Sequence, residues 1–419
     1  MRPIQAPEHR AIAEQAAAYG LCEHCLGRML ARVDHGLGND ERGRLLCEAH
    51  DLETVPIPGC YICQGLFDRL ERMTDVAEAT LKQVEFETYL VGTRVAHDIE
   101  ARDELVKEDI GTEETENLTT ELNREIGRRL WERHGWEAAF QRPQVTAVLD
   151  TRFDHVTLTY RSFCLYGRYR KFSREIPQTR WPCRSCRGVG CHKCEGTGLT
   201  YPTSVEQLVT PPVLEATGAT ESKFHGAGRE DVDALMLGSG RPFILEMVDP
   251  QRRFLDLEAV QEAINEHARP GAEVGPLQVV DPDLIPEVKA ARGGKVYQAT
   301  VAFDDDVAEE TLLNACRILS DAPVAQRTPS RVAHRRADKV RKRRVARIEP
   351  REVGSDGRTA ILLIEGDAGL YIKELISGDG GRTEPSLADQ VGTGATCTAL
   401  DVVHVEGPES LDEPPLPTE

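Results

Sequence analysis

A glycine-bounded stretch near the middle of the chain, residues 226–243, holds side chains whose types and spacing could do chemistry. It places three acidic and two basic side chains among four glycines, and Arg229-Glu230-Asp231 forms its charged centre. Glycine lets the backbone adopt positive φ angles and lets a ligand approach closely, and arginine offers a planar fork of donors for phosphate or carboxylate. Taken alone, the stretch is either a site built on one carboxylate or a solvated loop with an ion pair, because exposed ion pairs are common and contribute little stability.

Two later segments could complete a site around Asp231. Tyr297 lies on an expected strand, and Tyr371 stands two residues before Lys373. One ionised aspartate, a cation that keeps it ionised and a tyrosine on which a base can stack would suit a cofactor-free reaction on an RNA base. The chain has no P-loop and no Gly-x-Ser-x-Gly motif, and its one His-x-Glu, at His404, lacks a following Cys-x-x-Cys. These absences disfavour a P-loop nucleotide-binding enzyme, an α/β-hydrolase and a zinc base deaminase.

The spacing of the cysteines indicates metal-binding sites. Eight of the twelve fall in four Cys-x-x-Cys pairs, and a pair of such turns supplies the four thiolates that tetrahedral zinc prefers. Glycines in the second set permit tight turns that let backbone amides face the sulfurs. We interpret His24, Cys47 and His192 as non-ligands. The expected structural zinc sites are Cys22, Cys25, Cys60 and Cys63, and Cys183, Cys186, Cys191 and Cys194.

The net charge of −19 argues against a non-specific nucleic-acid binder. No signal peptide is expected and no apolar run approaches 18 residues, so we expect a cytoplasmic protein without a membrane span. Two basic segments stand out against this acidic background, at 160–172 and 326–348. We expect both to contact RNA. The alternatives are a basic edge strand with its aromatic residues in the core for the first segment and a solvated face for the second.

Apolar periodicity and length predict an α+β protein with several domains. Leu118, Leu122, Ile126 and Leu130 form a helical stripe, whereas Val156–Tyr160 alternates as a strand does. The largest unit mixes strands and helices and predicts a central, largely antiparallel sheet. The expected divisions are a zinc module at 1–65, an RNA-binding domain at 66–180, a zinc ribbon at 181–198, a catalytic domain at 199–405 with the basic insert 326–348, and a disordered tail at 406–419.

In three short motifs the chain resembles the pseudouridine synthases. Gly228-Arg229-Glu230-Asp231 resembles their Gly-Arg-x-Asp motif, Lys295-Val-Tyr297 their stacking-tyrosine motif, and Tyr371-Ile372-Lys373 the motif that supplies a basic residue. The chain departs from the usual pattern in having Gly369-Leu370 before Tyr371. More closely it resembles the archaeal tRNA pseudouridine synthases that modify uridines 54 and 55 of the T-arm. That likeness also covers the cysteine knuckles, Trp181-Pro-Cys183, Gln326-Arg327-Thr328-Pro329 and Ile376-Ser-Gly-Asp379.

The resemblance implies a THUMP-like RNA-binding domain at about 66–180, followed by a pseudouridine synthase domain that acts on the T-arm of tRNA. It implies no catalytic cofactor and no small-molecule cofactor. Asp231 would be the single catalytic carboxylate and Lys373 its partner, while we interpret Asp233 as structural. The expected substrate-binding residues are Tyr297 for stacking, Tyr371, Ile372 and Leu400 for the pocket, Lys373, and Arg229, which would order the loop or contact a phosphate.

Two other classes remain as alternatives. A non-catalytic tRNA-binding protein or chaperone would explain the cysteines and the basic segments, but not the combination of Asp231, Tyr297 and Lys373. A THUMP-bearing thiolation or methylation enzyme would need a pyrophosphate loop or a Rossmann glycine loop, and the sequence has neither.

Overall fold

The computed structural model describes residues 3–291, 293–333, 337–408 and 411. The chain divides into two compact units, Met1–Arg161 with Gln251–Phe254, and Ser162–Pro250 with Leu255–Glu419. Each unit has its own sheet and its own large hydrophobic core. Within the described part of the chain, no helix combines the length and the apolar character that a membrane crossing requires.

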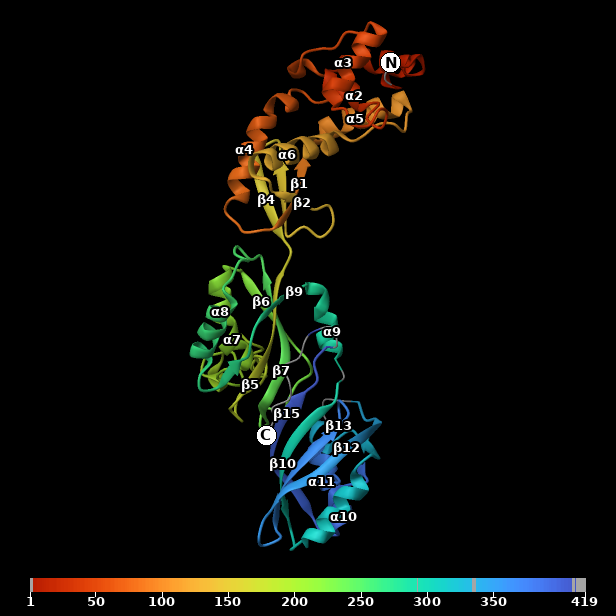
Figure 1. Cartoon of the computed structure of the whole chain (residues 1–419). Helices are drawn as coiled ribbons and strands as arrows, with labels where there is room; N and C mark the ends of the chain where they lie inside the picture. The colour runs from red at the N-terminus through yellow and green to blue at the C-terminus, as the bar shows by residue number, and fades with distance from the viewer. Residues whose placement is uncertain (1–2, 292, 334–336, 409–410, 412–419) are drawn as a thin grey trace. The chain divides into compact units, whose positions relative to one another are not determined.

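The first unit is built on a four-stranded sheet in the order β2-β1-β3-β4. Strand β1 runs parallel to β2 and β3, and β4 runs antiparallel to β3. Helices α4 and α6 pack against each other and against the sheet (Figure 1). The elements are α1 (Arg10–Ala17), α2 (Glu23–Arg28), α3 (Asn39–His50), α4 (Leu70–Leu81), β1 (Thr88–Arg94), α5 (His97–Ile110), α6 (Leu118–His134), β2 (Glu137–Ala138), β3 (Val145–Asp150) and β4 (His155–Tyr160).

Helix α6 shows how the sequence sets these elements. The four residues of its stripe, three leucines and one isoleucine, are buried, as the spacing predicted. The helix ends at Gly135, which takes a left-handed conformation with φ of 68°, the backbone geometry that glycine adopts most easily at a helix end. Its buried face also carries Glu121, which forms ion pairs with His24 and Arg28 of the N-terminal segment. The cysteine module and the α/β sheet therefore share one core.

The second unit is built on an 11-stranded sheet with the path β14-β11-β12-β13-β10-β15-β7-β5-β8; β6 pairs with β7, and β9 with β5. The pairing is antiparallel except between β15 and β7, which run parallel at Asp401 and Val402. The expected α+β class with a central, largely antiparallel sheet is confirmed. The strands are β5 (Phe163–Lys171), β6 (Glu221–Gly226), β7 (Leu235–Val248), β8 (Ala272–Val274), β9 (Gln278–Val280), β10 (Lys295–Phe303), β11 (Ala322–Arg327), β12 (Val340–Val353), β13 (Thr359–Gly366), β14 (Thr383–Glu384) and β15 (Ala395–Val405).

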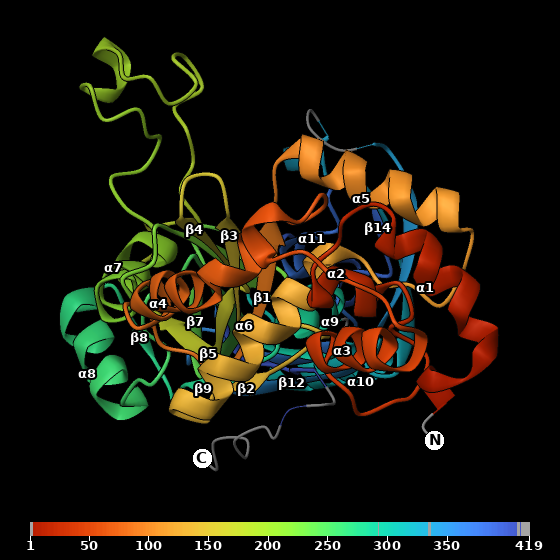
Figure 2. The same cartoon turned by 90° about the horizontal axis from the view of Figure 1, so that it is seen from above.

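Helices cover this sheet at both ends. Helices α7 and α8 pack together beside β8, and α10 packs on β12 (Figures 1 and 2). The segment between β5 and α7, which contains the second cysteine set, extends away from these helices as a long loop, drawn in yellow-green in Figure 2. The helices are α7 (Val205–Thr217), α8 (Leu257–Ala268), α9 (Ile285–Ala290), α10 (Glu309–Leu319), α11 (Ile372–Ser377) and α12 (Leu387–Val391).

Two parts of the second unit differ from what we expected. The RNA-binding domain was expected to run to residue 180, but β5 pairs with β7 and so belongs to the larger sheet. The second half of the basic insert at 326–348 is sheet, because β12 begins at Val340 and pairs with β11 and β13. Most of the expected disordered tail at 406–419 lies outside the described residues.

Candidate active site

The loop between β6 and β7 is held in place by one of its own residues, Glu230. This side chain is buried and accepts hydrogen bonds from the Tyr169 hydroxyl at 2.8 Å and from Arg241 Nε at 2.7 Å. Arg241 also donates to the carbonyl of Ala227 at 2.8 Å. Burial would lower the pKa of Arg241, but the charge and hydrogen bond of Glu230, together with Tyr169 and Tyr297, outweigh burial and raise that pKa. The buried pair thus holds the start of the loop to β5 and β7.

Two further side chains hold the loop backbone. Buried Lys171 donates from Nζ to the carbonyl of Val232 at 2.8 Å and approaches that of Asp231 at 3.5 Å. Gln178 donates to the carbonyl of Gly228 at 3.0 Å, whose φ of 72° lies in the left-handed region. Because these contacts are to main-chain atoms, the loop is fixed while the Asp231 carboxylate remains available; that side chain is 38% exposed.

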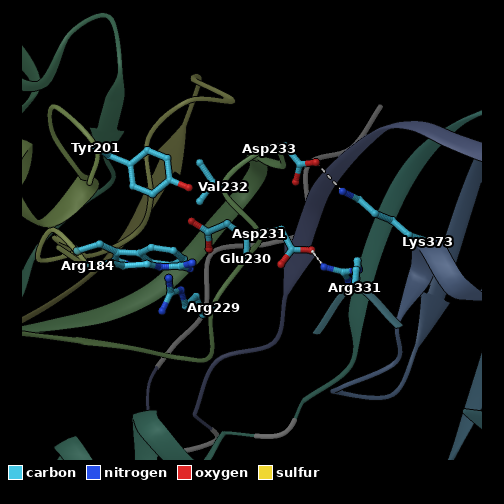
Figure 3. Close-up of a pocket in the computed structure, with 10 residues that line it drawn as sticks. Arg184, Tyr201, Arg229, Glu230, Asp231, Val232, Asp233, Arg331 and Lys373 are labelled. Atoms are coloured by element: carbon cyan, nitrogen blue, oxygen red, sulfur yellow. Dashed lines mark hydrogen bonds and ion pairs between the residues drawn. The ribbon is translucent and has the colours of Figure 1, made fainter. Parts of the chain in front are cut away.

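The partner of Asp231 is Arg331, not Lys373 as we expected. Arg331 lies on the short 3-10 helix Ser330–Val332 and donates from Nη1 to Asp231 Oδ2 at 2.9 Å (Figure 3). Its Nε donates to Glu374 Oε1 at 2.7 Å. Burial would lower the pKa of Arg331, but the hydrogen bond to Glu374 and the charge of Asp231 outweigh it and raise that pKa. Arg331 therefore presents a permanent cation to Asp231.

Lys373 pairs instead with Asp233, at 2.6 Å between Nζ and Oδ2 (Figure 3). Burial would raise the pKa of Asp233, but the hydrogen bond and the charge from Lys373 outweigh it and lower that pKa. Arg174 holds the same loop to β15, since it donates to the carbonyls of Asp233 and Leu400 at 3.0 and 3.1 Å. The two aspartates of the loop thus have separate cations, because they point to different neighbours.

A cavity of about 200 Å³ opens beside Asp231, and we call it the target cavity. Tyr297 on β10 and Leu400 on β15 line it from the sheet, and both are largely buried. The other lining residues that the sequence singled out are Arg229, Asp231, Tyr371, Ile372 and Lys373. The structure therefore brings all seven expected catalytic and substrate-binding residues to one cavity.

The position of Tyr371 is set by Gln326 at the end of β11. The buried Gln326 amide donates to the Tyr371 carbonyl at 2.9 Å and accepts from the Tyr371 N–H at 2.8 Å. Tyr371 precedes α11, so this double contact fixes the helix start and the buried Ile372 that follows. The Gln326-Arg327-Thr328-Pro329 segment thus supports the cavity through its first residue.

Burial shapes the chemistry of the cavity floor. Lys295 lies on β10 beside Arg241, and burial together with that like charge lowers its pKa to about 8. Burial raises the pKa of Tyr297, so this ring stays neutral near pH 7. A neutral aromatic ring beside one carboxylate and a fixed cation can stack a flat ring and apply a nucleophile or base to the group attached to it.

The two basic segments behave differently. In 160–172 the charged and aromatic side chains of β5 are mostly inside, with Arg168, Tyr169 and Lys171 all buried. The expectation of RNA contact there is not supported. The alternative, a basic edge strand with its aromatic residues in the core, is right about the core, but β5 is not an edge strand, since it pairs with β7, β8 and β9. In 326–348, Lys339 and Lys342 are exposed, so β12 retains cations at the surface.

Both expected metal sites assemble. Each set of four cysteine sulfurs gathers within 4.8 Å, which suits a metal ion. Bonds of about 2.3 Å to tetrahedral zinc place sulfurs about 3.8 Å apart, and Cys22 and Cys63 are separated by 3.8 Å, as are Cys186 and Cys194. The N–H groups of Gly190 and Gly198 donate to sulfur at 3.2 Å, as the glycine spacing predicted. His24 hydrogen-bonds with Glu121 and belongs to neither set.

The residues that support Asp231 were not predicted from the sequence. Arg331 was assigned only to a phosphate-binding segment, although its place directly after Gln326-Arg327-Thr328-Pro329 could have suggested a role near the site. Glu230 and Lys171 carried no usable signal, because a charged side chain is far more often exposed than buried.

Two models of one protein family match this chain. A family model described as Pus10, C-terminal, matches residues 164–406, and one described as Pus10 THUMP domain, archaeal, matches residues 73–150.

The similar proteins are named for one activity. A protein of Halorubrum lacusprofundi named tRNA pseudouridine synthase Pus10 is 44% identical over 418 residues, 96% of this chain and 97% of the relative. One of Methanothrix thermoacetophila with the same name is 40% identical and covers 92% of each chain. Among solved structures, a Cbf5-Nop10-Gar1 complex aligns with a TM-score of 0.30 and 17% identity, over 55% of this chain and 48% of that chain.

Proposed function

Because this chain belongs to the Pus10 family, we propose that it isomerises uridine to pseudouridine in tRNA and that the carboxylate of Asp231 carries the chemistry. The observation that supports this most strongly is the arrangement at the target cavity. One partly exposed carboxylate faces a buried tyrosine and is held by one arginine. The proposal needs no cofactor, since the carboxylate and the substrate itself supply every group that reacts.

In the proposed reaction the target uridine is flipped out of the tRNA and stacked on Tyr297, since chemistry on a base requires it to leave the stack. Ile372 and Leu400 close on the base as apolar walls, because both are buried against the cavity. The Asp231 carboxylate then attacks C1′ or removes the C2′ proton, and in both versions the N1–C1′ bond breaks.

The freed uracil rotates within the cavity and its C5 bonds to C1′. A base then removes the C5 proton, while N1 ends with a proton in place of the glycosidic bond. Substrate and product are isomers, so no oxidant or co-substrate enters. Arg331 keeps Asp231 ionised in this scheme, because an opposite charge at hydrogen-bonding distance favours the charged form.

We assign the T-arm as the site of modification, with uridines 54 and 55 as the targets. This assignment rests on the resemblance to the archaeal T-arm enzymes. A buried T-arm uridine must be unstacked before it can react, and the exposed Lys339 and Lys342 can bind the phosphates of the displaced strand. With tRNA as its substrate, the enzyme would work in the cytoplasm.

We propose zinc as the metal of both cysteine sets, with a structural role. Four thiolates fill a tetrahedral zinc site completely and leave no open position for water or substrate. The eight cysteines would hold it, and Gly190 and Gly198 would stabilise the thiolates of the ribbon through their N–H groups.

Metal removal should affect the two sets unequally. Cys22, Cys25, Cys60 and Cys63 are buried, whereas two of the ribbon cysteines are partly exposed. We expect a chelator to take the ribbon metal first, and the buried metal only as the first unit unfolds. The measurement is metal content and thiol reactivity over time; simultaneous loss of both metals would contradict the expectation.

Replacing Arg331 should cost more activity than replacing Lys373. Arg331→Met removes the hydrogen bond to Asp231 and leaves buried Glu374 without its cation, so we expect the single-turnover rate to fall by about 10²- to 10³-fold. Lys373→Met leaves both contacts in place, so we expect a smaller loss. Rates at saturating enzyme, with tRNA binding measured separately, decide the order; a larger loss in Lys373→Met would reverse the assignment.

The reaction class is tested with unmodified tRNA that carries tritium at C5 of uridine. The proposed isomerisation must release tritium to water once for each pseudouridine formed. A non-catalytic tRNA-binding protein would bind this RNA and release none.

A further inference from the structure

A second, larger cavity of about 800 Å³ adjoins the target cavity, and we call it the flanking cavity. The two share Asp231, Arg331, Lys373 and two further loop residues as lining, so they are continuous around the carboxylate. The flanking cavity alone reaches Trp181, Arg184 and Tyr201 at the base of the cysteine ribbon. The mechanism above uses none of these three side chains.

The aromatic residues of the flanking cavity form an ordered group. The Trp181 and Tyr201 rings pack edge to face with their centroids 5.4 Å apart. The Arg229 guanidinium lies over the Trp181 ring, 4.4 Å from its centroid. The ribbon itself holds the two rings at this spacing, because Pro182 bridges Leu199 and the Thr200 N–H donates to the Trp181 carbonyl at 2.9 Å.

Polar groups in the same place are available to a ligand. Within the described residues, the Tyr201 hydroxyl has no hydrogen-bond partner and Arg184 forms no ion pair. The Tyr201 hydroxyl points from the ribbon toward the catalytic loop at Val232 (Figure 3). Aromatic rings that stack a base, with arginines and a hydroxyl that bind its edge or its phosphate, are how proteins recognise unpaired nucleotides.

We propose that the flanking cavity is a subsite for one nucleotide of the tRNA that neighbours the target uridine. This inference rests on the proposed function, since it takes the target uridine to occupy the smaller cavity. The RNA strand on at least one side of a flipped uridine must then leave through the cavity that adjoins it. Trp181 and Tyr201 contact the neighbouring base, and Arg184 contacts its phosphate. The cysteine ribbon thereby becomes part of substrate selection and not only a structural support.

The first test is tRNA binding by ribbon variants, measured by fluorescence anisotropy of labelled unmodified tRNA. Trp181→Ala should raise the Kd roughly tenfold, because base–aromatic stacking supports effects of that order. Trp181→Phe should restore binding to within about twofold, since a phenyl ring still stacks. Val189→Ala is the matched control at the exposed ribbon tip and should leave the Kd unchanged.

The second test asks which base sits in the cavity. A set of tRNAs carries a single abasic site at each position next to the target, and each is bound to the wild type and to Trp181→Ala. One abasic position should weaken binding of the wild type roughly tenfold and have no further effect in Trp181→Ala, because the lost contact is the same. If the losses of binding free energy from the abasic site and from Trp181→Ala add fully at every neighbouring position, the proposal is overturned.

Metal content distinguishes a loss of RNA contact from a loss of folding, and binding measured without turnover distinguishes the subsite from the proposed function. Metal content and reactive thiols of Trp181→Ala should match the wild type; if they do not, the exposed Arg184→Ala carries the test. Arg184→Ala should weaken binding of unmodified tRNA by several-fold, and equal binding by Arg184→Ala and the wild type would overturn the subsite. Binding is measured without turnover, so failure of the wild type to make pseudouridine would refute the proposed function separately.

Discussion

Asp231→Asn should abolish pseudouridine formation and leave tRNA binding nearly intact. The carboxylate is the one group at the target cavity proposed to attack C1′ or to remove the C2′ proton, and an amide can do neither. Loss of a sole nucleophile or base slows enzymes by about 10⁴-fold or more. The substitution is nearly isosteric, and the loop is held through Glu230 and main-chain carbonyls, so the fold should not change.

Asp233→Asn is the matched control for this variant. Asp233 lies two residues away in the same loop, but its carboxylate pairs with Lys373 and is 63% exposed. Its replacement removes an equal charge from the loop without touching the proposed chemistry, so we expect at most a roughly tenfold loss. Single-turnover rates with each variant, at enzyme concentrations far above the Kd, give the comparison. Equal losses in the two variants would mean that loop charge matters and not the Asp231 carboxylate.

Glu230→Ala should destabilise the second unit by about 3–5 kcal/mol. The change leaves the buried Arg241 guanidinium without its anion and the Tyr169 hydroxyl without its acceptor. Removal of one partner from a buried ion pair typically costs about 3–5 kcal/mol, because the other charge stays desolvated and uncompensated. Native-state hydrogen exchange of β5 and β7 should report the loss.

Two comparisons isolate the cause. Asp306→Ala breaks an exposed pair with Arg358 in the same unit, where both side chains are more than half exposed, and should cost less than about 1 kcal/mol. The double variant Glu230→Ala with Arg241→Met removes both charges and should recover part of the loss. If Glu230→Ala matches Asp306→Ala in exchange protection, the buried network does not anchor the loop.

Much of this architecture follows from local patterns. The stripe in α6, the alternation in β4 and the spacing of the cysteines each depend on residues close together in the sequence, so periodicity and ligand geometry predict them. The motifs carried by Asp231, Tyr297 and Tyr371-Ile372-Lys373 identified the lining of the target cavity, because each is a short segment with its own resemblance.

What the sequence did not predict depends on distant pairs. Arg331 and Asp231 are 100 residues apart, and no local pattern states which of the many basic residues reaches a given carboxylate. Burial of Lys171 and Glu230 also escaped prediction, since burial of a charge depends on partners brought together by the whole sheet. The basic segment 326–348 was interpreted as an insert because the charges in its second half mask the strand pattern of β12.

The central claim is that this chain converts T-arm uridines to pseudouridine through Asp231. The most direct measurement incubates the wild type and Asp231→Asn with unmodified tRNA and maps pseudouridine at single-nucleotide resolution. We expect pseudouridine at positions 54 and 55 with the wild type and none with Asp231→Asn. Pseudouridine at those positions with Asp231→Asn, or none anywhere with the wild type, would contradict the central claim.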